Sequence, residues 1–339
     1  MSGPRPARFV VGTGRCGSTL LSRMLAMNAK VLNVFELFSG LEPAFRFATR
    51  RVGGRELAGQ LRLDHPMLTM VMKRGYDVPE VVYPFDDPGT RHARGDAVPW
   101  ALAIAIPRIT DDPDRLFDEL IERVEAAPTR ALSRHYRAIF DWLTDATGRQ
   151  CWIERSGTSI DFLGELEQLF PDARFVHIHR DGREAALSMR EYAVLRVAVA
   201  VMNGLAGDID YTHEGLTRLE REDGAAIDRL LETRPPIELY GRYWSDQIRN
   251  GESARRRLPD AICLDVRFED LVTQPRDELA RIARFLELPD DGGDRAGGWI
   301  ERAAALSRGM PRLRFPSLAN EERERLDAAC AASMKLLGR

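Results

Sequence analysis

The sequence has few cysteines and no arrangement of them that is typical of a disulfide framework or a zinc site. Only four occur in 339 residues, Cys16, Cys151, Cys263 and Cys330, and none belongs to a C-x-x-C pair. The six histidines include no H-E-x-x-H motif. We therefore expect reduced thiols and no metal centre.

Long apolar runs and an excess of one charge are also lacking. The longest apolar run, residues 100–106, has seven residues, far fewer than the roughly 20 that cross a bilayer. The first residues contain no apolar stretch of signal-peptide length. Lys and Arg number 49 against 52 Asp and Glu, a net charge of −3, which argues against a general nucleic-acid binder. These features predict a cytoplasmic protein with no transmembrane segment and no nucleic-acid partner.

Short apolar segments alternate with helical patterns along the chain. Strands are expected at residues 8–12, 31–35, 151–155, 175–179 and 261–266, and helices at 18–27 and 160–170. This alternation is typical of βαβ units on a largely parallel sheet. We therefore predict an α/β fold of three layers around a central, mostly parallel sheet.

Two long segments between the expected strands have helical patterns, at about residues 40–147 and 189–250. Ligands of open α/β sheets bind beyond the carboxyl ends of the strands, so we expect these insertions to wall an acceptor-binding crevice. No repeat, low-complexity tract or linker divides the chain, and residues 1–339 are expected to form one domain. An alanine-rich helix at about 321–337 has a face that suits either this domain or a second subunit, so a homo-oligomer is possible.

A glycine-rich octet at residues 12–19, GTGRCGST, has the spacing of G-x-x-x-x-G-K-S/T between a strand and a helix. Backbone N–H groups in such a loop bind phosphate or sulfate. Ser18 stands where nucleotide triphosphatases have lysine, and no acidic strand end is apparent for Mg²⁺, which argues against their chemistry. Arg15 adds a guanidinium that binds oxyanions well. The alternative is a glycine-rich turn with a solvated Arg15.

A second anion site is predicted at residues 175–188. A buried strand ends in Arg180, and Ser188 follows about two turns into the next helix. An arginine with a hydroxyl suits a second, separate phosphate. The alternative for Arg180 is an ion pair with Asp181 or Glu184.

These two elements resemble the 5′-phosphosulfate loop and the 3′-phosphate motif of sulfotransferases that use 3′-phosphoadenosine-5′-phosphosulfate (PAPS). Residues 151–157 are similar to the W-x-E-K-S/T-P stretch of that family, residues 169–175 to the lead-in of its 3′-phosphate strand, and residues 268–289 to its Y-E-D-L to L-P segment. The matches follow the family order. Where serine, lysine, proline and tyrosine are common in the family, this chain has Cys16, Arg155, Gly157 and Phe268.

The resemblance implies a P-loop-like fold and a transfer of the sulfuryl group from PAPS to an acceptor hydroxyl, which yields 3′-phosphoadenosine-5′-phosphate (PAP) and a sulfate ester without a metal. The residues expected to bind the donor are Arg15, Cys16, Gly17, Ser18 and Thr19 in the loop, Arg180 and Ser188 at the 3′-phosphate, and Arg308 and Gly309 in a late basic loop. Arg15 is expected across the sulfuryl oxygens, and Arg155 is the candidate to stabilise the bridging oxygen.

Glu36 is our candidate for the catalytic base. It follows the second strand among apolar neighbours, which would raise its pKa and suit it to proton abstraction, and a glutamate there resembles the base of tyrosylprotein and bacterial sulfotransferases. The alternative is a half-exposed carboxylate at the start of a helix. His65 and His135 are the other candidates for the base.

The acceptor is less constrained by the sequence. Aromatic and methionine side chains gather between residues 35 and 100, where they would either line a pocket for an aromatic, lipid-like or glycolipid hydroxyl or pack helices together. We therefore expect a PAPS-dependent sulfotransferase of small-molecule or lipid hydroxyls. The alternatives are a P-loop kinase of altered loop chemistry and a non-catalytic nucleotide-binding or scaffold protein.

Overall fold

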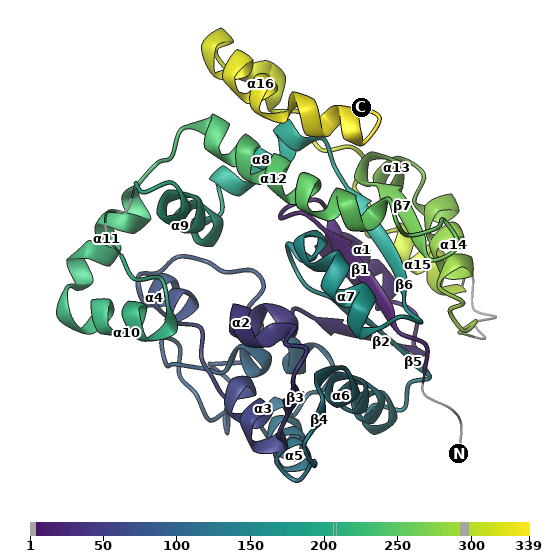
Figure 1. Ribbon diagram of the computed structural model, residues 1–339. Coiled ribbons are helices and arrows are strands. Elements are labelled where there is room, and N and C mark those ends of the chain that lie inside the picture. The colour runs from purple at the N-terminus through teal and green to yellow at the C-terminus, as the bar shows by residue number, and fades with distance from the viewer. Residues whose placement is uncertain (1–4, 206, 208, 292–297) are drawn as a thin grey trace.

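A five-stranded parallel sheet runs through the centre of the computed structural model, which describes residues 5–205, 207, 209–291 and 298–339. The strand order is β2-β5-β1-β6-β7 (Figure 1). The strands are β1 Arg8–Gly12, β2 Val31–Phe35, β5 Cys151–Arg155, β6 Arg174–His179 and β7 Cys263–Arg267. The predicted α/β fold with a parallel central sheet is confirmed, with strand ends within two residues of those expected from the sequence.

Successive residues of each strand belong to different layers. Phe9 and Val11 pack toward α6 (Leu132–Ala146) and α7 (Leu163–Leu169). Val10 lies in the opposite layer with α1 (Ser18–Leu25), α14 (Pro275–Phe285) and α15 (Gly298–Ala304). Because both faces of the sheet are covered, the strands carry buried apolar residues on both sides, as in other parallel sheets. The helix expected at 160–170 is divided into a 3₁₀ turn, η4 (Ser159–Phe162), and α7.

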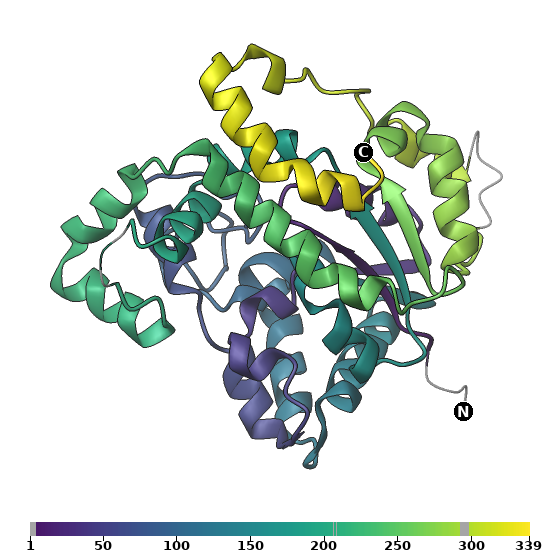
Figure 2. The same cartoon turned by 45° about the horizontal axis from the view of Figure 1, so that its top comes forward.

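The two long segments between the strands contribute most of the remaining helices. The first contains α2 Pro43–Arg46, α3 Gly54–Leu61, α4 Pro66–Lys73, α5 Pro113–Glu125, α6 and a short antiparallel pair, β3 Arg51–Val52 with β4 Arg130–Ala131. The second contains α9 Ala193–Met202, α10 His213–Glu222, α11 Gly224–Glu232 and most of α12 Ile237–Arg255. Helix α4 packs on α9 and α10, so the two segments meet beside the sheet (Figures 1 and 2).

The apolar run at 100–106 is short and lies inside the protein. Residues Ala101–Ala105 form a π-helix, η2, which continues into the 3₁₀ turn η3 at Ile106–Arg108, and all five residues of η2 are buried. Among the residues that the structure describes, no helix has the length and apolar composition to span a membrane.

The last helix, α16 (Asn320–Leu336), lies along α12 in both views (Figures 1 and 2). The contact is close at Gly241, where a Cβ atom would lie 2.9 Å from Leu326 and 3.3 Å from the Cys330 sulfur. Helix α8 (Gly182–Arg190) completes this layer, because it packs against both α12 and α16. The alanine-rich helix therefore packs on its own chain.

Gly12 allows the loop after β1 to pass close to β6. A Cβ atom there would lie 2.6 Å from both the Cys16 Sγ and the main-chain oxygen of Ile178. We expect Gly12→Ala to lower the free energy of unfolding by roughly 1–3 kcal/mol, since this packed backbone has no room for a methyl group. Chemical denaturation measures the change.

Gly59→Ala is the matched control. Gly59 lies in the interior of α3, and a Cβ atom added there would have no neighbouring atom within 4 Å, so alanine should stabilise the chain by up to about 1 kcal/mol through helix propensity. Equal effects of the two substitutions would contradict the proposed close contact at Gly12.

Candidate active site

The five strands all end at one edge of the sheet, and the residues that follow them enclose a cavity of about 530 Å³. The loop after β1 lies beside Glu36, which follows β2, and Gly157, which follows β5 by two residues. Arg180 follows β6 and lines the same cavity. Four segments distant in the sequence thus meet at the position where open α/β sheets bind ligands.

The loop after β1 directs unpaired amides into this cavity. Gly17 has φ of +100° and precedes α1, whose first residues lack a side-chain cap. Within the described part of the chain, the N–H groups of Gly17, Ser18 and Thr19 have no hydrogen-bond acceptor. Together with the helix N-terminus they form a site suited to an anion.

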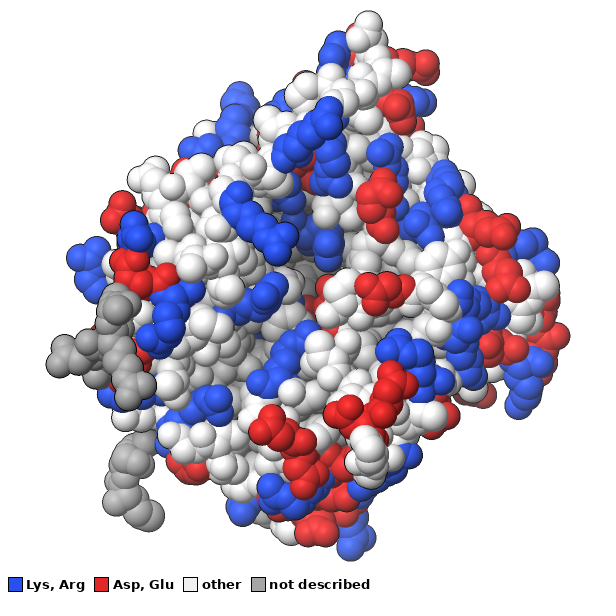
Figure 3. Space-filling view, turned by 180° about the vertical axis from the view of Figure 1, so that it is seen from behind, with Lys and Arg blue, Asp and Glu red and all other residues white. Residues whose placement is uncertain are grey.

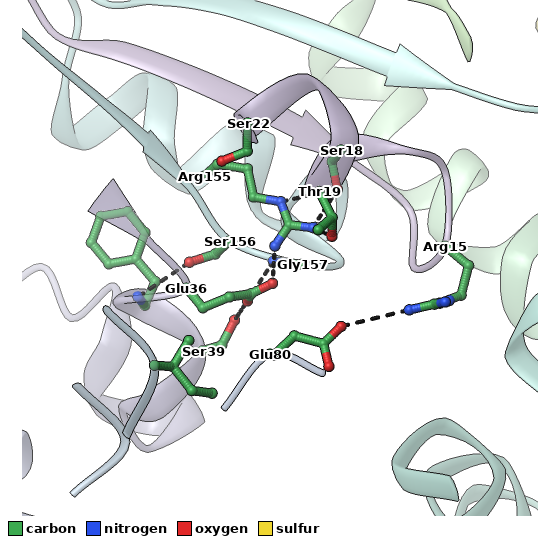
Figure 4. A network of polar contacts seen from close by, with 12 residues as sticks. Arg15, Ser18, Thr19, Ser22, Glu36, Ser39, Glu80, Arg155, Ser156 and Gly157 are labelled. Carbon is green, nitrogen blue, oxygen red and sulfur yellow. Dashed lines mark hydrogen bonds and ion pairs between the residues drawn. The ribbon is translucent and has the colours of Figure 1, made fainter. Parts of the chain in front are cut away.

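Arg155 connects this loop to Glu36 (Figure 4). Its Nε and Nη2 donate to the Ser18 hydroxyl at 3.0 and 2.7 Å, and Nη2 also donates to the Thr19 hydroxyl at 2.6 Å. Its Nη1 forms an ion pair with Oε1 of Glu36, and both side chains are buried. Ser18 is the residue at the position where nucleotide triphosphatases have lysine, and the guanidinium of Arg155 therefore lies beside that position.

Glu36 lies in polar surroundings, so the apolar environment expected from its neighbours in the sequence was wrong. Its Oε2 accepts hydrogen bonds from the Ser39 hydroxyl at 2.5 Å and from the Gly157 N–H at 2.7 Å. Its backbone has φ of +57°, in the left-handed region, and this turn directs the carboxylate into the cavity while Leu37 and Phe38 enter the core. The Trp100 indole donates to the Glu36 carbonyl at 2.6 Å.

Glu154 is a second buried carboxyl group next to this pair. It accepts a hydrogen bond from the Ser156 hydroxyl at 2.5 Å, and the Ser156 oxygen accepts from the Phe38 N–H at 3.2 Å. Burial raises the pKa of Glu154 to about 8, and the nearby Glu36 adds to the shift. Glu154 is therefore mostly protonated at pH 7, whereas Glu36 has a cationic partner.

Arg180 has no hydrogen-bond or ion-pair partner among the described residues. Its guanidinium lies 4.7 Å from the centre of the Phe268 ring, and burial lowers its pKa. The expected alternative, an ion pair with Asp181 or Glu184, does not form: Asp181 pairs with Arg183, and Glu184 binds Arg314.

Arg15 and Ser188, which were expected at different ends of the donor, are joined to each other. The Arg15 Nε donates to the Ser188 hydroxyl at 3.1 Å. Its Nη1 lies 3.6 Å from Oε1 of Glu80, and its guanidinium lies 5.1 Å from the centre of the Tyr192 ring. Tyr192 in turn donates to Glu80 at 2.8 Å. Figure 4 shows Arg15 directed toward Glu80.

Other residues expected at the site lie elsewhere or contribute only their backbone. The Cys16 side chain is buried in the core layer of α1. Arg308 and Gly309 do not line the cavity, and their part in donor binding stays a prediction. His135 is buried and contacts the Val52 carbonyl at 2.9 Å, away from the cavity. His65 does line the cavity, and burial lowers its pKa to about 4.

Trp100, one of the aromatic residues expected at a pocket, lines the cavity, and three further cavity residues were not expected from the sequence: Arg46, Glu80 and Tyr192. Glu80 lies in no motif. Lys and Arg side chains also gather around a hollow in one face of the molecule, despite the negative net charge (Figure 3).

Comparison with known families matches the profile of the Sulfotransferase family to residues 6–222 and 231–292, more than half of the chain. The chain belongs to the sulfotransferase family. No curated protein matches its sequence significantly.

Three solved structures show how this sulfotransferase resembles others. The sulfotransferase domain from the curacin biosynthetic pathway has 17% identity and a TM-score of 0.51, over 99% of each chain. The sulfotransferase domain of the Synechococcus PCC 7002 olefin synthase has 17% identity and a TM-score of 0.43, over 100% of this chain and 95% of that one. Sulfotransferase STF9 from Mycobacterium avium has 18% identity and a TM-score of 0.45, over 98% of this chain and 77% of that one. The first of these likenesses shows a shared fold.

The raised pKa of Glu154 has a consequence for stability. The unfolded chain releases this proton near the ordinary glutamate pKa, about 4.3, whereas the folded chain keeps it until about pH 8. The contribution is therefore fully present below pH 4.3 and is lost as the pH rises to 8, by about 1.4 kcal/mol per pH unit. We therefore expect the free energy of unfolding of Glu154→Gln, which cannot titrate, to rise relative to that of the wild type between pH 5 and 8.

Denaturant unfolding at pH 5, 6, 7 and 8 measures this difference. Glu56→Gln is the control, since Glu56 is exposed and pairs with Arg50 on the surface. A stability difference between Glu154→Gln and wild type that is the same at pH 5 and pH 8 would show that Glu154 is ionised in the folded chain.

Proposed function

We propose that this chain transfers a sulfuryl group from PAPS to a hydroxyl of a small-molecule or lipid-like acceptor, with PAP and a sulfate ester as products. The observation that carries the proposal is the position of Arg155, which contacts both the anion-binding loop and Glu36. Membership of the sulfotransferase family supports the same reaction.

The residues present fit a nucleotide with two separate anionic groups. In this proposal the amides of Gly17, Ser18 and Thr19 bind the 5′-phosphate, because they lack acceptors of their own. Arg180 binds the 3′-phosphate, because its guanidinium faces the cavity and has no ionic partner among the described residues. Arg15 and Ser188, which are hydrogen-bonded to each other, contact the donor between the 5′-phosphate and the 3′-phosphate.

Glu36 acts as the base in the proposed reaction. The acceptor hydroxyl gives its proton to Glu36 as its oxygen bonds to sulfur, and the bond from sulfur to the phosphate oxygen of PAP breaks. A carboxylate has about four acceptor sites, and protein donors occupy three of those on Glu36, which leaves one for the acceptor hydroxyl. Catalysis of sulfuryl transfer depends mainly on fixed hydrogen-bond donors and on positive charge near the leaving oxygen. In this proposal Arg155 supplies the donors and the charge.

The acceptor side of the cavity is formed by the two long insertions, which we propose as acceptor walls within one domain of residues 1–339. Pro79, Glu80 and Trp100 come from the first insertion, and Tyr192 and Val194 from the second. Helical packing between α4 and α9 joins these walls.

Arg180→Ala tests the donor end. Loss of a charged hydrogen bond to phosphate removes about 1.5–3 kcal/mol, so we expect PAP affinity to fall by roughly 10- to 100-fold in titration calorimetry. Arg190→Ala is the control, since Arg190 lies in the same helix region but pairs with Glu191 at the surface. Unchanged PAP affinity in Arg180→Ala would remove Arg180 from the 3′-phosphate site.

Glu36→Gln tests the base. We expect turnover, followed as labelled sulfate transferred from PAPS into a metabolite extract, to fall by about 10²- to 10⁴-fold, while PAP still binds. Undiminished turnover would exclude Glu36 as the base. Binding of Mg²⁺-ATP without PAP binding would favour a kinase, and PAP binding by the wild type without any transfer would favour a non-catalytic protein.

A further inference from the structure

Arg46 lies at the cavity wall without an anionic partner. It is the last residue of α2, and its Nη2 donates to the main-chain oxygens of Leu41 at 3.0 Å and Ser39 at 3.4 Å. The guanidinium also lies 5.2 Å from the centre of the Phe162 ring. These contacts hold the side chain in place but do not neutralise it. In the described ranges no carboxylate lies within ion-pair distance of Arg46, and its Nε has no hydrogen-bond partner.

The acidic groups near Arg46 do not neutralise its charge. Glu36 pairs with Arg155, and Glu154 is mostly protonated at pH 7. Tyr136 contributes only a neutral hydroxyl, which donates to the Arg46 carbonyl at 2.6 Å. Burial lowers the pKa of Arg46. A partly buried cation without a counter-charge is costly, so this wall favours the binding of an anion.

His65 lines the same cavity as Arg46. Its ring lies 4.9 Å from that of Trp100, and Trp100 is bonded to the Glu36 carbonyl. Burial, with a contribution from the Arg46 charge, lowers the pKa of His65 to about 4, so the ring is neutral at pH 7. Its Nδ1 is shielded from solvent and has no hydrogen-bond partner among the described residues. The ring thus contributes an uncharged polar group to the lining of the cavity.

We infer that Arg46 and His65 form a subsite for a carboxylate of the acceptor, so the acceptor is a hydroxy acid whose hydroxyl faces Glu36. The planar guanidinium matches a carboxylate in shape and charge. The inference rests on the proposed sulfuryl transfer and narrows its acceptors from any small or lipid-like alcohol to acids of that kind. A bound carboxylate would provide the counter-charge that the protein does not supply to Arg46.

Paired probes test this subsite. The affinities of 4-hydroxyphenylacetate and 12-hydroxydodecanoate, each against its own methyl ester, are measured by calorimetry on protein saturated with PAP. We expect the acid of at least one pair to bind ten times or more tighter than its ester, a difference within the usual range for a charged hydrogen bond. We expect Arg46→Gln to lower the affinity for that acid about tenfold or more and to change ester affinity by less than about twofold.

Arg50→Gln is the matched control, because Arg50 is exposed and pairs with Glu56; it should leave the preference for acids unchanged. Arg46→Lys keeps a cation and should retain part of the preference, which covers the case in which Arg46→Gln does not fold. The inference is contradicted if the acids bind wild type no more tightly than their esters, if neither member of any pair binds, or if Arg46→Gln keeps the full preference. PAP that fails to bind wild type contradicts the proposed function instead, and the inference with it.

Discussion

The ion pair between Arg155 and Glu36 is the interaction on which the rest of the site depends. Arg155 ends β5, Glu36 follows β2, and the register pairs Phe35 with Arg155, so the two groups are brought together by adjacent strands. A buried ion pair is stabilising only where hydrogen bonds satisfy its remaining atoms. Here Ser18 and Thr19 accept from the guanidinium, while Ser39 and the Gly157 amide donate to the carboxylate. The pair therefore holds the loop and the proposed base at a fixed separation.

Two departures from the usual family residues work together in this network. Arg155 stands where the W-x-E-K-S/T-P stretch has lysine, and its planar group contacts Ser18, Thr19 and Glu36 through three different nitrogens. Gly157 stands where that stretch has proline, and its N–H binds Glu36; a proline has no N–H to donate. The space is also limited, since a Cβ on Gly157 would lie 3.2 Å from the Glu36 carboxylate. Glycine thus supplies both the donor and the room that this arrangement of Glu36 requires.

Backbone strain is concentrated around the same cavity. Four residues other than glycine have positive φ among those described, and three of them, Arg15, Glu36 and Thr158, line the cavity. Such conformations are unfavourable and persist where the surrounding contacts impose them. At Glu36 the turn explains why its apolar sequence neighbours did not predict its surroundings: they enter the core, while the carboxylate faces Arg155.

The sequence alone was sufficient to predict the strands and the loop after β1, and insufficient to predict the wall that we propose for the acceptor. Strands in a parallel sheet are buried on both faces, so they are short, mostly apolar segments that can be recognised locally. The loop and Arg180 belong to motifs with fixed spacing. Glu80 and Arg46 instead come from a segment without a motif, and they reach the cavity only through the packing of that segment. Contacts of this kind depend on the tertiary structure and leave no local pattern.

The charged residues of the cavity fall into two groups, those that pair with each other and those that have no ionic partner among the described residues. Five arginines and two glutamates line it: Arg15, Arg23, Arg46, Arg155 and Arg180, with Glu36 and Glu80. The two glutamates pair with Arg155 and Arg15, where the proposed reaction needs side chains of constant orientation. The other three have no carboxylate partner among the described residues, and of these Arg23 is exposed, whereas Arg180 and Arg46 are partly buried. Arg180 follows β6 and Arg46 ends α2, so they lie in different parts of the wall. Since a partly buried, unpaired cation in a cavity gains most from an anion brought by a ligand, these two arginines are the positions at which, in our proposals, the donor and the acceptor each contribute a negative charge.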